Sequence, residues 1–208
     1  MGNMRNKLLL VVGVLVTIII VLYVSVQSVL APISVVDQNN NQNIMSNSLT
    51  LTSPSFLNGG IIPSQFTCDG ENTPPPLTIS GVPSGTKSLV LVVDDSDIPQ
   101  VVKDARGIEK FDHWSLYNIP PETTEIIDSG NYSVGENGVG ELRYTGPCPP
   151  PGLEPREHRY SFRLYALSGT LNFIKAPTLD ELELAVAGMM IEKTELIGRY
   201  RRLIEPGD

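Results

Sequence analysis

The chain contains only two histidines, and each stands at the start of a segment with the pattern of a β-strand. From His158 to Leu167, HRYSFRLYAL, aromatic and aliphatic residues alternate with polar ones without a glycine or proline. His113 opens a second such run, HWSLYNIP, which ends in two prolines. Histidine side chains donate and accept hydrogen bonds and titrate near neutral pH. The two strands are therefore predicted to present both histidines to one pocket.

The residues beside these strands suit a small anion. Tyr160 shares a face with His158, because side chains alternate along a strand, and both can donate hydrogen bonds. The turn GPCPPPG just upstream begins with Gly146 and Pro147 and is too rich in proline and glycine for a helix or strand. Backbone N–H groups of such a turn can hold a phosphate or carboxylate, although proline supplies none.

Acidic residues lie next to a third predicted strand. The unbroken apolar run of Lys87–Asp94 predicts a strand buried on both faces, and Asp95 and Asp97 follow it directly. Carboxylates this close together need solvent, donors or a cation nearby. They suit an ammonium group, so the pocket as a whole suits a zwitterion such as phosphoethanolamine. A zinc site of His113, His158 and a carboxylate is the alternative, but these histidines lack helical ligand spacing.

The elements that position these residues are mostly short strands separated by Pro/Gly turns. This pattern predicts a mostly β fold, a two-sheet antiparallel β-sandwich with one or two C-terminal helices. A capping-box pattern at Thr178 predicts a helix over Leu179–Lys193, with Arg199–Arg202 following a break at Gly198. Gln100–Lys110 is predicted to be a polar loop.

The N-terminal part differs from the rest in composition. Leu8–Leu30 has no charged residue, and at about 23 residues it could span a bilayer as a helix. Residues 1–30 are therefore predicted to be a membrane anchor or signal segment, 31–48 a flexible linker, and 49–205 the folded domain. The basic residues before the apolar run predict that the domain lies outside the cytoplasm, anchored by one helix, or is secreted if the chain is cleaved near Ala31.

Charge and cysteine content restrict the partners. The formal net charge of −8 argues against nucleic acid as a partner. Cys68 and Cys148 are the only cysteines. An even count in an exported domain predicts one disulfide, and two free buried thiols are the alternative.

Three motifs, in order, resemble the phosphatidylethanolamine-binding protein family, in its bacterial and archaeal branch often called Raf kinase inhibitor-like. They are VVDDSDIP, FDHWSLYNIP and GPCPPPG followed by HRYSFRLYAL. FTCDGENTPPPLTISGVP and KTELIGRY are also similar to that branch, so the resemblance runs from about Leu49 to Tyr200. It implies a two-sheet β-sandwich with C-terminal helices and an anion pocket at one end.

The resemblance also implies roles for individual residues. The pocket would be formed by Asp95, Asp97, His113, Gly146, Pro147, His158 and Tyr160. The family binds phosphorylated head groups and similar anions, some members inhibit kinases or serine proteases, and it is not generally enzymatic. The chain departs from the family pattern at Ser96, where proline is usual, at Ile98, where a small residue is usual, and in the insertion Leu153–Glu157.

Three functions follow as expectations. The first is a non-enzymatic domain, outside the membrane, that binds a small anionic or zwitterionic ligand without a metal or other cofactor. The second is a protein-interaction module, such as an inhibitor of an exported protease, acting through the rim of the pocket. The third is a hydrolase that uses histidine and aspartate as acid and base.

Overall fold

The computed structural model describes residues 48–127 and 130–202, which form two β-sheets with short helices. The small sheet has the order β1-β3-β6, and the large sheet has the order β2-β9-β8-β4-β5-β7. The strands are β1 (Thr50–Thr52), β2 (Gly60–Ile61), β3 (Leu77–Ser80), β4 (Ser88–Asp95), β5 (Phe111–Ile119), β6 (Glu125–Ile126), β7 (Ser133–Val134), β8 (Glu157–Leu167) and β9 (Met190–Arg201). The helices are the 3₁₀ helix η2 (Ser64–Phe66) and the α-helices α2 (Gln100–Arg106) and α3 (Leu179–Ala187).

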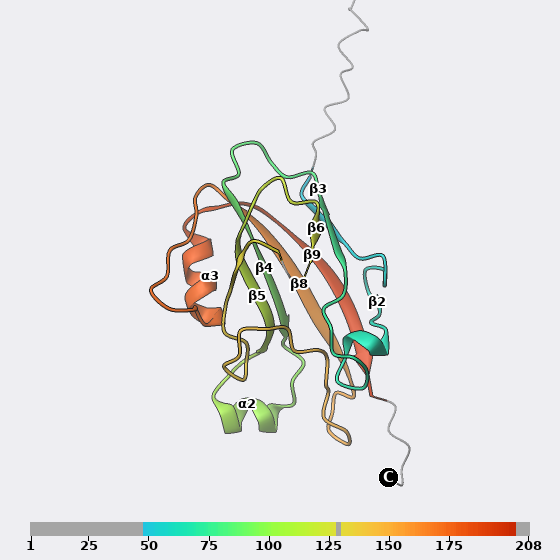
Figure 1. Cartoon of the computed structure of the whole chain (residues 1–208). Coiled ribbons are helices and arrows are strands. Elements are labelled where there is room, and N and C mark those ends of the chain that lie inside the picture. The colour runs from blue at the N-terminus through green and yellow to red at the C-terminus, as the bar shows by residue number, and fades with distance from the viewer. Residues whose placement is uncertain (1–47, 128–129, 203–208) are drawn as a thin grey trace, which may run out of the picture. The chain divides into compact units, whose positions relative to one another are not determined.

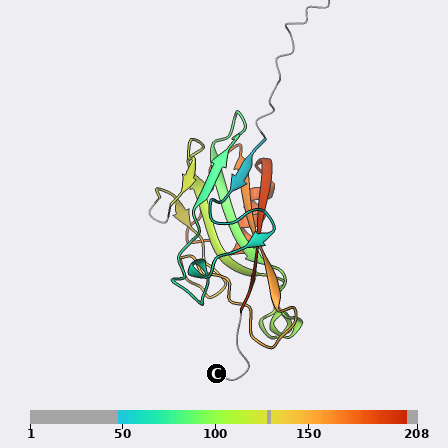
Figure 2. The same cartoon turned by 90° about the vertical axis from the view of Figure 1, so that its right-hand side faces the viewer.

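The large sheet is covered on both faces. Figure 1 shows α3 on one side of the long strands and the small sheet on the other, and in Figure 2 the small sheet lies in front of the long strands. The pairing is antiparallel except between β2 and β9, which run parallel. The expected two-sheet, mostly β architecture is confirmed.

β4 shows why the sheet has two buried faces. Leu89, Leu91 and Val93 point into the cluster between the sheets, whereas Val90 and Val92 pack under α3. This alternation follows from the period of two residues in a strand. Each such side chain, when fully buried, contributes about 1.5–3 kcal/mol to folding.

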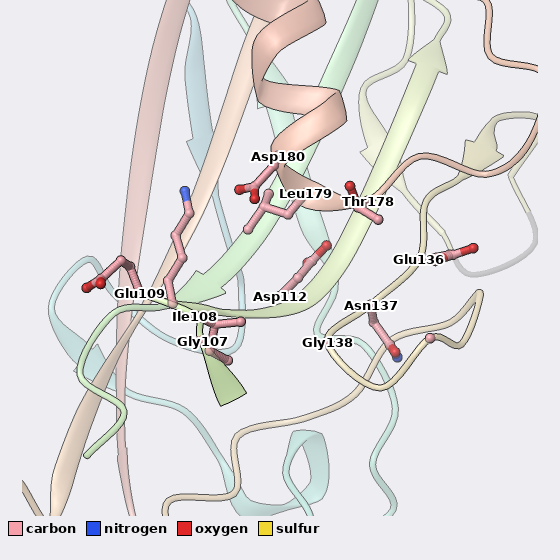
Figure 3. A pocket seen from close by; sticks show the side chains of 12 residues that line it. Gly107, Ile108, Glu109, Asp112, Glu136, Asn137, Gly138, Thr178, Leu179 and Asp180 are labelled. Carbon is pink, nitrogen blue, oxygen red and sulfur yellow. The ribbon is translucent and has the colours of Figure 1, made fainter. Parts of the chain in front are cut away.

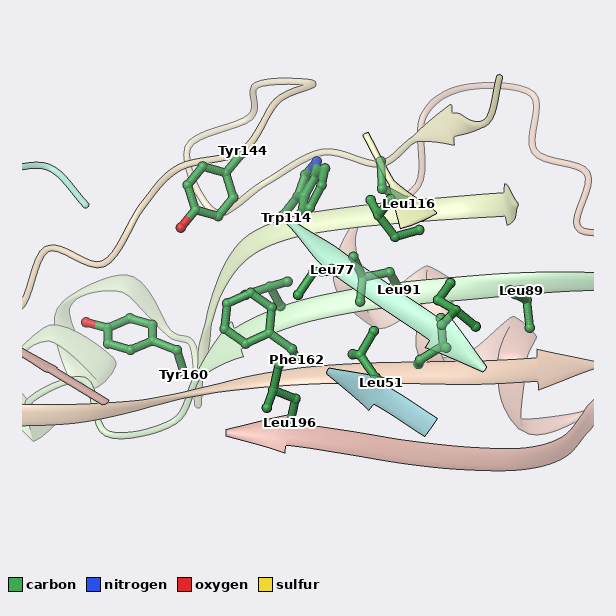
Figure 4. Close-up of a cluster of buried hydrophobic side chains, with 14 of the residues drawn as sticks. Leu51, Leu77, Leu89, Leu91, Trp114, Leu116, Tyr144, Tyr160, Phe162 and Leu196 are labelled. Carbon is green, nitrogen blue, oxygen red and sulfur yellow. The ribbon is translucent and has the colours of Figure 1, made fainter. Parts of the chain in front are cut away.

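β8 follows the same rule, as the sequence predicted. Tyr160, Phe162, Leu164 and Ala166 belong to the cluster between the sheets, and Leu167 belongs to the cluster under α3. Figure 4 shows Tyr160 at one end of the inner cluster. The inner face of the sheet therefore leads from an aliphatic core into the polar residues at the start of β8.

The C-terminal prediction was wrong in part. The capping box forms, with the Thr178 hydroxyl accepting from the Glu181 N–H, but the helix ends at Ala187. β9 begins at Met190 and pairs with β8 over its whole length, so no helix and no break occurs at Gly198. A long antiparallel partner stabilises the strand over the helix that the local sequence favours. Gln100–Arg106, predicted to be a loop, is helix α2.

The prediction of an N-terminal transmembrane helix, with the membrane-anchored location drawn from it, is corrected. Within residues 48–127 and 130–202, no helix is long and apolar enough to cross a membrane. The predicted segment, Leu8–Leu30, lies outside the described residues, as does most of the predicted linker 31–48.

Candidate functional site

Both nitrogens of the buried His158 ring are occupied. Nδ1 lies 2.6 Å from Oδ2 of Asp95, and Nε2 lies 3.0 Å from the carbonyl oxygen of Pro155. The Pro155 carbonyl oxygen can only accept, so Nε2 carries a proton, and Nδ1 shares a second proton with the Asp95 carboxyl group. Since His158 and Asp95 are 0% and 2% exposed, the pair is fixed within the fold. His158 therefore positions its neighbours and has no nitrogen left for a ligand.

Asp97 is also neutralised inside the protein. Arg159 donates to both of its carboxylate oxygens, at 2.8 Å from Nε and 2.7 Å from Nη2. These charge-assisted hydrogen bonds hold the pKa of Asp97 below its usual range, despite the opposing effect of partial burial. The second oxygen of Asp95 accepts from the Asp97 backbone N–H at 2.7 Å. Both acids expected to bind an ammonium group thus already have partners within the protein, His158 for Asp95 and Arg159 for Asp97.

A β-bulge places His113 in the site. Val93 pairs with Trp114 and Asp94 with Asp112, so His113 is the extra residue between them. Regular alternation along β5 would place His113 on the same face as Ser115 and Tyr117. Instead its ring packs edge-on against Tyr160 of the inner face, with ring centroids 5.1 Å apart.

The hydrogen bonding of His113 leaves one ring nitrogen free. Its Nδ1 donates to the Thr145 carbonyl oxygen at 2.6 Å, and Nε2 has no partner among the described residues. Burial lowers the pKa of His113 below 6.5, because a charged ring would lose its hydration. The ring is therefore neutral at pH 7, and Nε2 can accept a proton or a hydrogen bond.

The Tyr160 hydroxyl is the main unsatisfied group of the site. It is buried, and it is one of two such side-chain atoms in residues 48–127 and 130–202 that make no hydrogen bond of full geometry, although the Cys148 backbone N–H lies near its oxygen and partly offsets the rise in its pKa. In Figure 4 it points away from the aliphatic core, at the same end as the Tyr144 hydroxyl, which donates to the Phe66 carbonyl oxygen at 2.8 Å. Burial raises the pKa of Tyr160, so its hydroxyl stays protonated and can donate.

The turn after Thr145 is held in place by contacts with residues 66–72. The Gly146 N–H donates to the Asn72 side chain at 2.7 Å, and the Pro147 carbonyl accepts from the Cys68 N–H at 3.1 Å. A Cβ at Gly146 would lie 2.4 Å from the Phe66 carbonyl oxygen, so only glycine fits. A disulfide joins Cys68 and Cys148. The Gly146 N–H, expected to face an anion, is thus committed to the loop.

The structure brings together six of the seven predicted residues at one end of the inner face; Asp97 lies beside them, in the turn after β4. The structure also shows three residues that the sequence did not single out. Each of them contacts a predicted site residue, through a backbone carbonyl oxygen or through a charged side chain, so its own residue type gave no signal. Thr145 orients His113, Pro155 orients His158, and Arg159 neutralises Asp97.

A cavity of about 390 Å³ lies elsewhere and contains none of the predicted residues. Figure 3 shows that Asp112 points toward the start of α3 within it, opposite Thr178 and Leu179. Burial raises the pKa of Asp112 to about 6, against hydrogen bonds from Ser115 and from the Trp114 N–H. Acidic groups predominate in its lining, which does not suit an anion.

Within the described part of the chain, no group of three or more potential metal ligands is present.

Comparison with known proteins agrees with this architecture. The model of the family described as phosphatidylethanolamine-binding protein matches residues 52–201. The chain belongs to this family. A protein of Methanothermobacter thermautotrophicus, named only UPF0098 protein, is 40% identical over 162 residues, which cover 74% of this chain and 99% of that protein.

Two solved structures of family members share the fold. The crystal structure of a putative phosphatidylethanolamine-binding protein homolog, CT736 from Chlamydia trachomatis, is 36% identical, with a TM-score of 0.68, over 76% of this chain and 99% of that one. E. coli YbcL, described as a new member of the mammalian family, is 27% identical, with a TM-score of 0.65, over 74% of this chain and 99% of its own. The family expected from the motifs is therefore confirmed.

Proposed function

We propose that this protein is a non-enzymatic binding domain whose pocket holds a phosphate-like oxyanion between Tyr160 and His113. The observation that carries the proposal is the buried Tyr160 hydroxyl, whose O–H has no acceptor among the described residues. An unsatisfied buried polar group costs about 1–3 kcal/mol, and a ligand oxygen that accepts from it would recover this energy. Nε2 of His113, from the adjoining ring, would supply the second contact.

The groups around Tyr160 and His113 would offer an anion hydrogen-bond donors without a net negative charge. Asp95 would repel an anion, but its pairing with His158 offsets that charge. His113 is neutral when the pocket is empty and would take up a proton as the anion binds, because the anion stabilises the imidazolium ring. Binding and protonation of His113 are then linked.

A purely binding role fits the groups around the histidines. Among the described residues, neither His113 nor His158 hydrogen-bonds to a hydroxyl or a thiol, as a nucleophile activated by a base would require. A panel of phosphate and carboxylate esters provides the test. Turnover that is lost in His113→Asn would establish an enzyme and overturn this part of the proposal.

The binding test is calorimetric titration of the full chain with inorganic phosphate. Tyr160→Phe removes one hydroxyl and should weaken binding about ten- to hundredfold, as expected for a hydrogen bond to a charged group. Tyr165→Phe, on the same strand but in the cluster under α3, is the matched control and should bind as wild type does. Equal affinity in the wild type and Tyr160→Phe would refute the pocket.

The pH dependence of anion binding tests the role of His113. Sulfate, which does not titrate near neutrality, should bind more tightly as pH falls toward the lowered pKa of His113, by up to tenfold per pH unit. In His113→Asn, the amide can still donate to Thr145 but has no atom at the Nε2 position. This variant should bind weakly and show no such slope. An identical slope in both proteins would assign the proton to another group.

A further inference from the structure

The cavity of about 390 Å³ beside α3 has no part in the proposed function. It lies where the loop from α2 to β5, the start of β5, the segment after β7 and the start of α3 meet. Cavities that hold small ligands have volumes of about 300–1,000 Å³. Its charged lining residues are four acids and one lysine, namely Glu109, Asp112, Glu136, Asp180 and Lys110. The space is therefore large enough for a small ligand, and its charge favours a cation.

Asp112 is the one buried acid of this lining. It is 4% exposed, and Figure 3 shows its carboxyl group directed toward the start of α3. The Trp114 N–H and the Ser115 hydroxyl each donate to one of its oxygens. A carboxylate can accept about four hydrogen bonds, so acceptor positions on Asp112 remain for a donor that enters the cavity.

The nearest cations do not neutralise Asp112. Lys110 Nζ lies 2.6 Å from Glu183 and 3.4 Å from Asp94, and Arg163 contacts the same two acids. These four side chains form a closed group with no net charge. Among residues 48–127 and 130–202, no cation forms an ion pair with Asp112. An ionised, buried carboxylate without a cationic partner is costly, and a cationic ligand would supply that partner.

The remaining lining suits an alkyl chain better than a metal ion. Ile108 and Leu179 contribute apolar surface to the cavity. The part of the chain that the structure describes has no group of three or more His, Cys, Asp or Glu side chains placed to hold a metal ion. An alkylammonium ion needs only one carboxylate for its head and an apolar surface for its tail.

We propose that this cavity binds a small organic cation, whose primary ammonium group donates to Asp112 and whose alkyl chain packs against Ile108 and Leu179. The inference does not rest on the proposed function, because neither His113 nor Tyr160 lines the cavity. It also gives the buried acid a role. A titratable group that costs stability and lies in the wall of a cavity is typical of a binding site.

The test is calorimetric titration of the full chain at pH 7.5 with n-butylammonium, and with n-butanol as a neutral probe of similar size. The ammonium ion should bind at least tenfold more tightly than the alcohol. Asp112→Asn should weaken ammonium binding about ten- to hundredfold, as expected for the loss of a hydrogen bond between charged groups. Asp104→Asn is the matched control, because it removes a carboxylate from the surface of α2, outside the cavity lining, and it should bind as wild type does.

Two results would overturn the proposal. If the wild type binds n-butylammonium no more tightly than n-butanol, or binds neither, the cavity is not a cation site. If wild type and Asp112→Asn bind the ammonium ion equally, the cation binds elsewhere. Tyr160→Phe should leave the affinity for n-butylammonium unchanged, so the failure of the anion pocket and the failure of the cation site can be told apart.

Discussion

Asp112 precedes His113 in β5, and its buried carboxylate should destabilise the folded protein at neutral pH. Burial raises its pKa to about 6, whereas in the unfolded chain it is near 3.8. The difference of about two units corresponds to about 3 kcal/mol, at 1.36 kcal/mol per unit. The folded protein binds the proton more tightly, so this contribution is fully present below pH 3.8 and is lost as pH rises through 6.

Asp112→Asn removes the charge and keeps the shape. The amide oxygen can still accept from the Trp114 N–H, and the amide nitrogen can donate to the Ser115 hydroxyl, which rotates to accept. Relative to wild type, the unfolding free energy of the variant should increase by about 2.4 kcal/mol between pH 4 and pH 7, because at pH 4 the carboxyl of the unfolded chain is already partly ionised.

The assay is urea unfolding of both proteins at half-unit steps from pH 4 to pH 7.5. Comparing the two proteins cancels the pH dependence of all other groups. Asp104→Asn, on the exposed surface of α2, controls for the loss of one carboxylate. A difference between wild type and Asp112→Asn that stays constant with pH would show that burial does not raise the pKa of Asp112 and would refute the reasoning.

Three further predictions concern the pocket and its supports. Tyr160→Phe should raise the unfolding free energy by about 1 kcal/mol or more, because it removes a buried hydroxyl that makes no full hydrogen bond, and it should weaken phosphate binding. A clear loss of stability in urea would show that the hydroxyl does have a hydrogen-bond partner in the folded protein. His158→Ala should destabilise the protein by about 3–5 kcal/mol, because it leaves Asp95 buried and unpaired, and a stability equal to wild type would contradict the pairing. Replacing Cys68 and Cys148 by serine opens a loop of 80 residues and should lower the unfolding free energy by about 4.5 kcal/mol; the variant should then be insensitive to a reductant that destabilises wild type.

The structure changes the roles of the two histidines. From the sequence, His113 and His158 were equivalent, since each opens a strand. In the structure, His158 is a buried positioning residue with both nitrogens used, and His113 keeps one nitrogen free. A loss of binding in a His158 variant would therefore report damage to the fold, and a His113 variant is the better test of contact with the ligand.

The sequence by itself determined which strands carry the site and which face of β8 is buried. The alternation from Tyr160 to Leu167 and the apolar run of β4 suffice for this, because a strand has a fixed period of two residues. The motifs also determined the family and the set of residues at one end of the sandwich. All of this information is local or repeats at a fixed spacing.

Tertiary structure alone decided the rest. The bulge that turns His113 toward Tyr160 depends on the register between β4 and β5, which no residue of β5 specifies on its own. β9 is a strand only because β8 offers a partner along its full length. Whether a charge is free or paired is likewise a matter of contacts between distant segments, so only the folded chain shows that Arg159 neutralises Asp97.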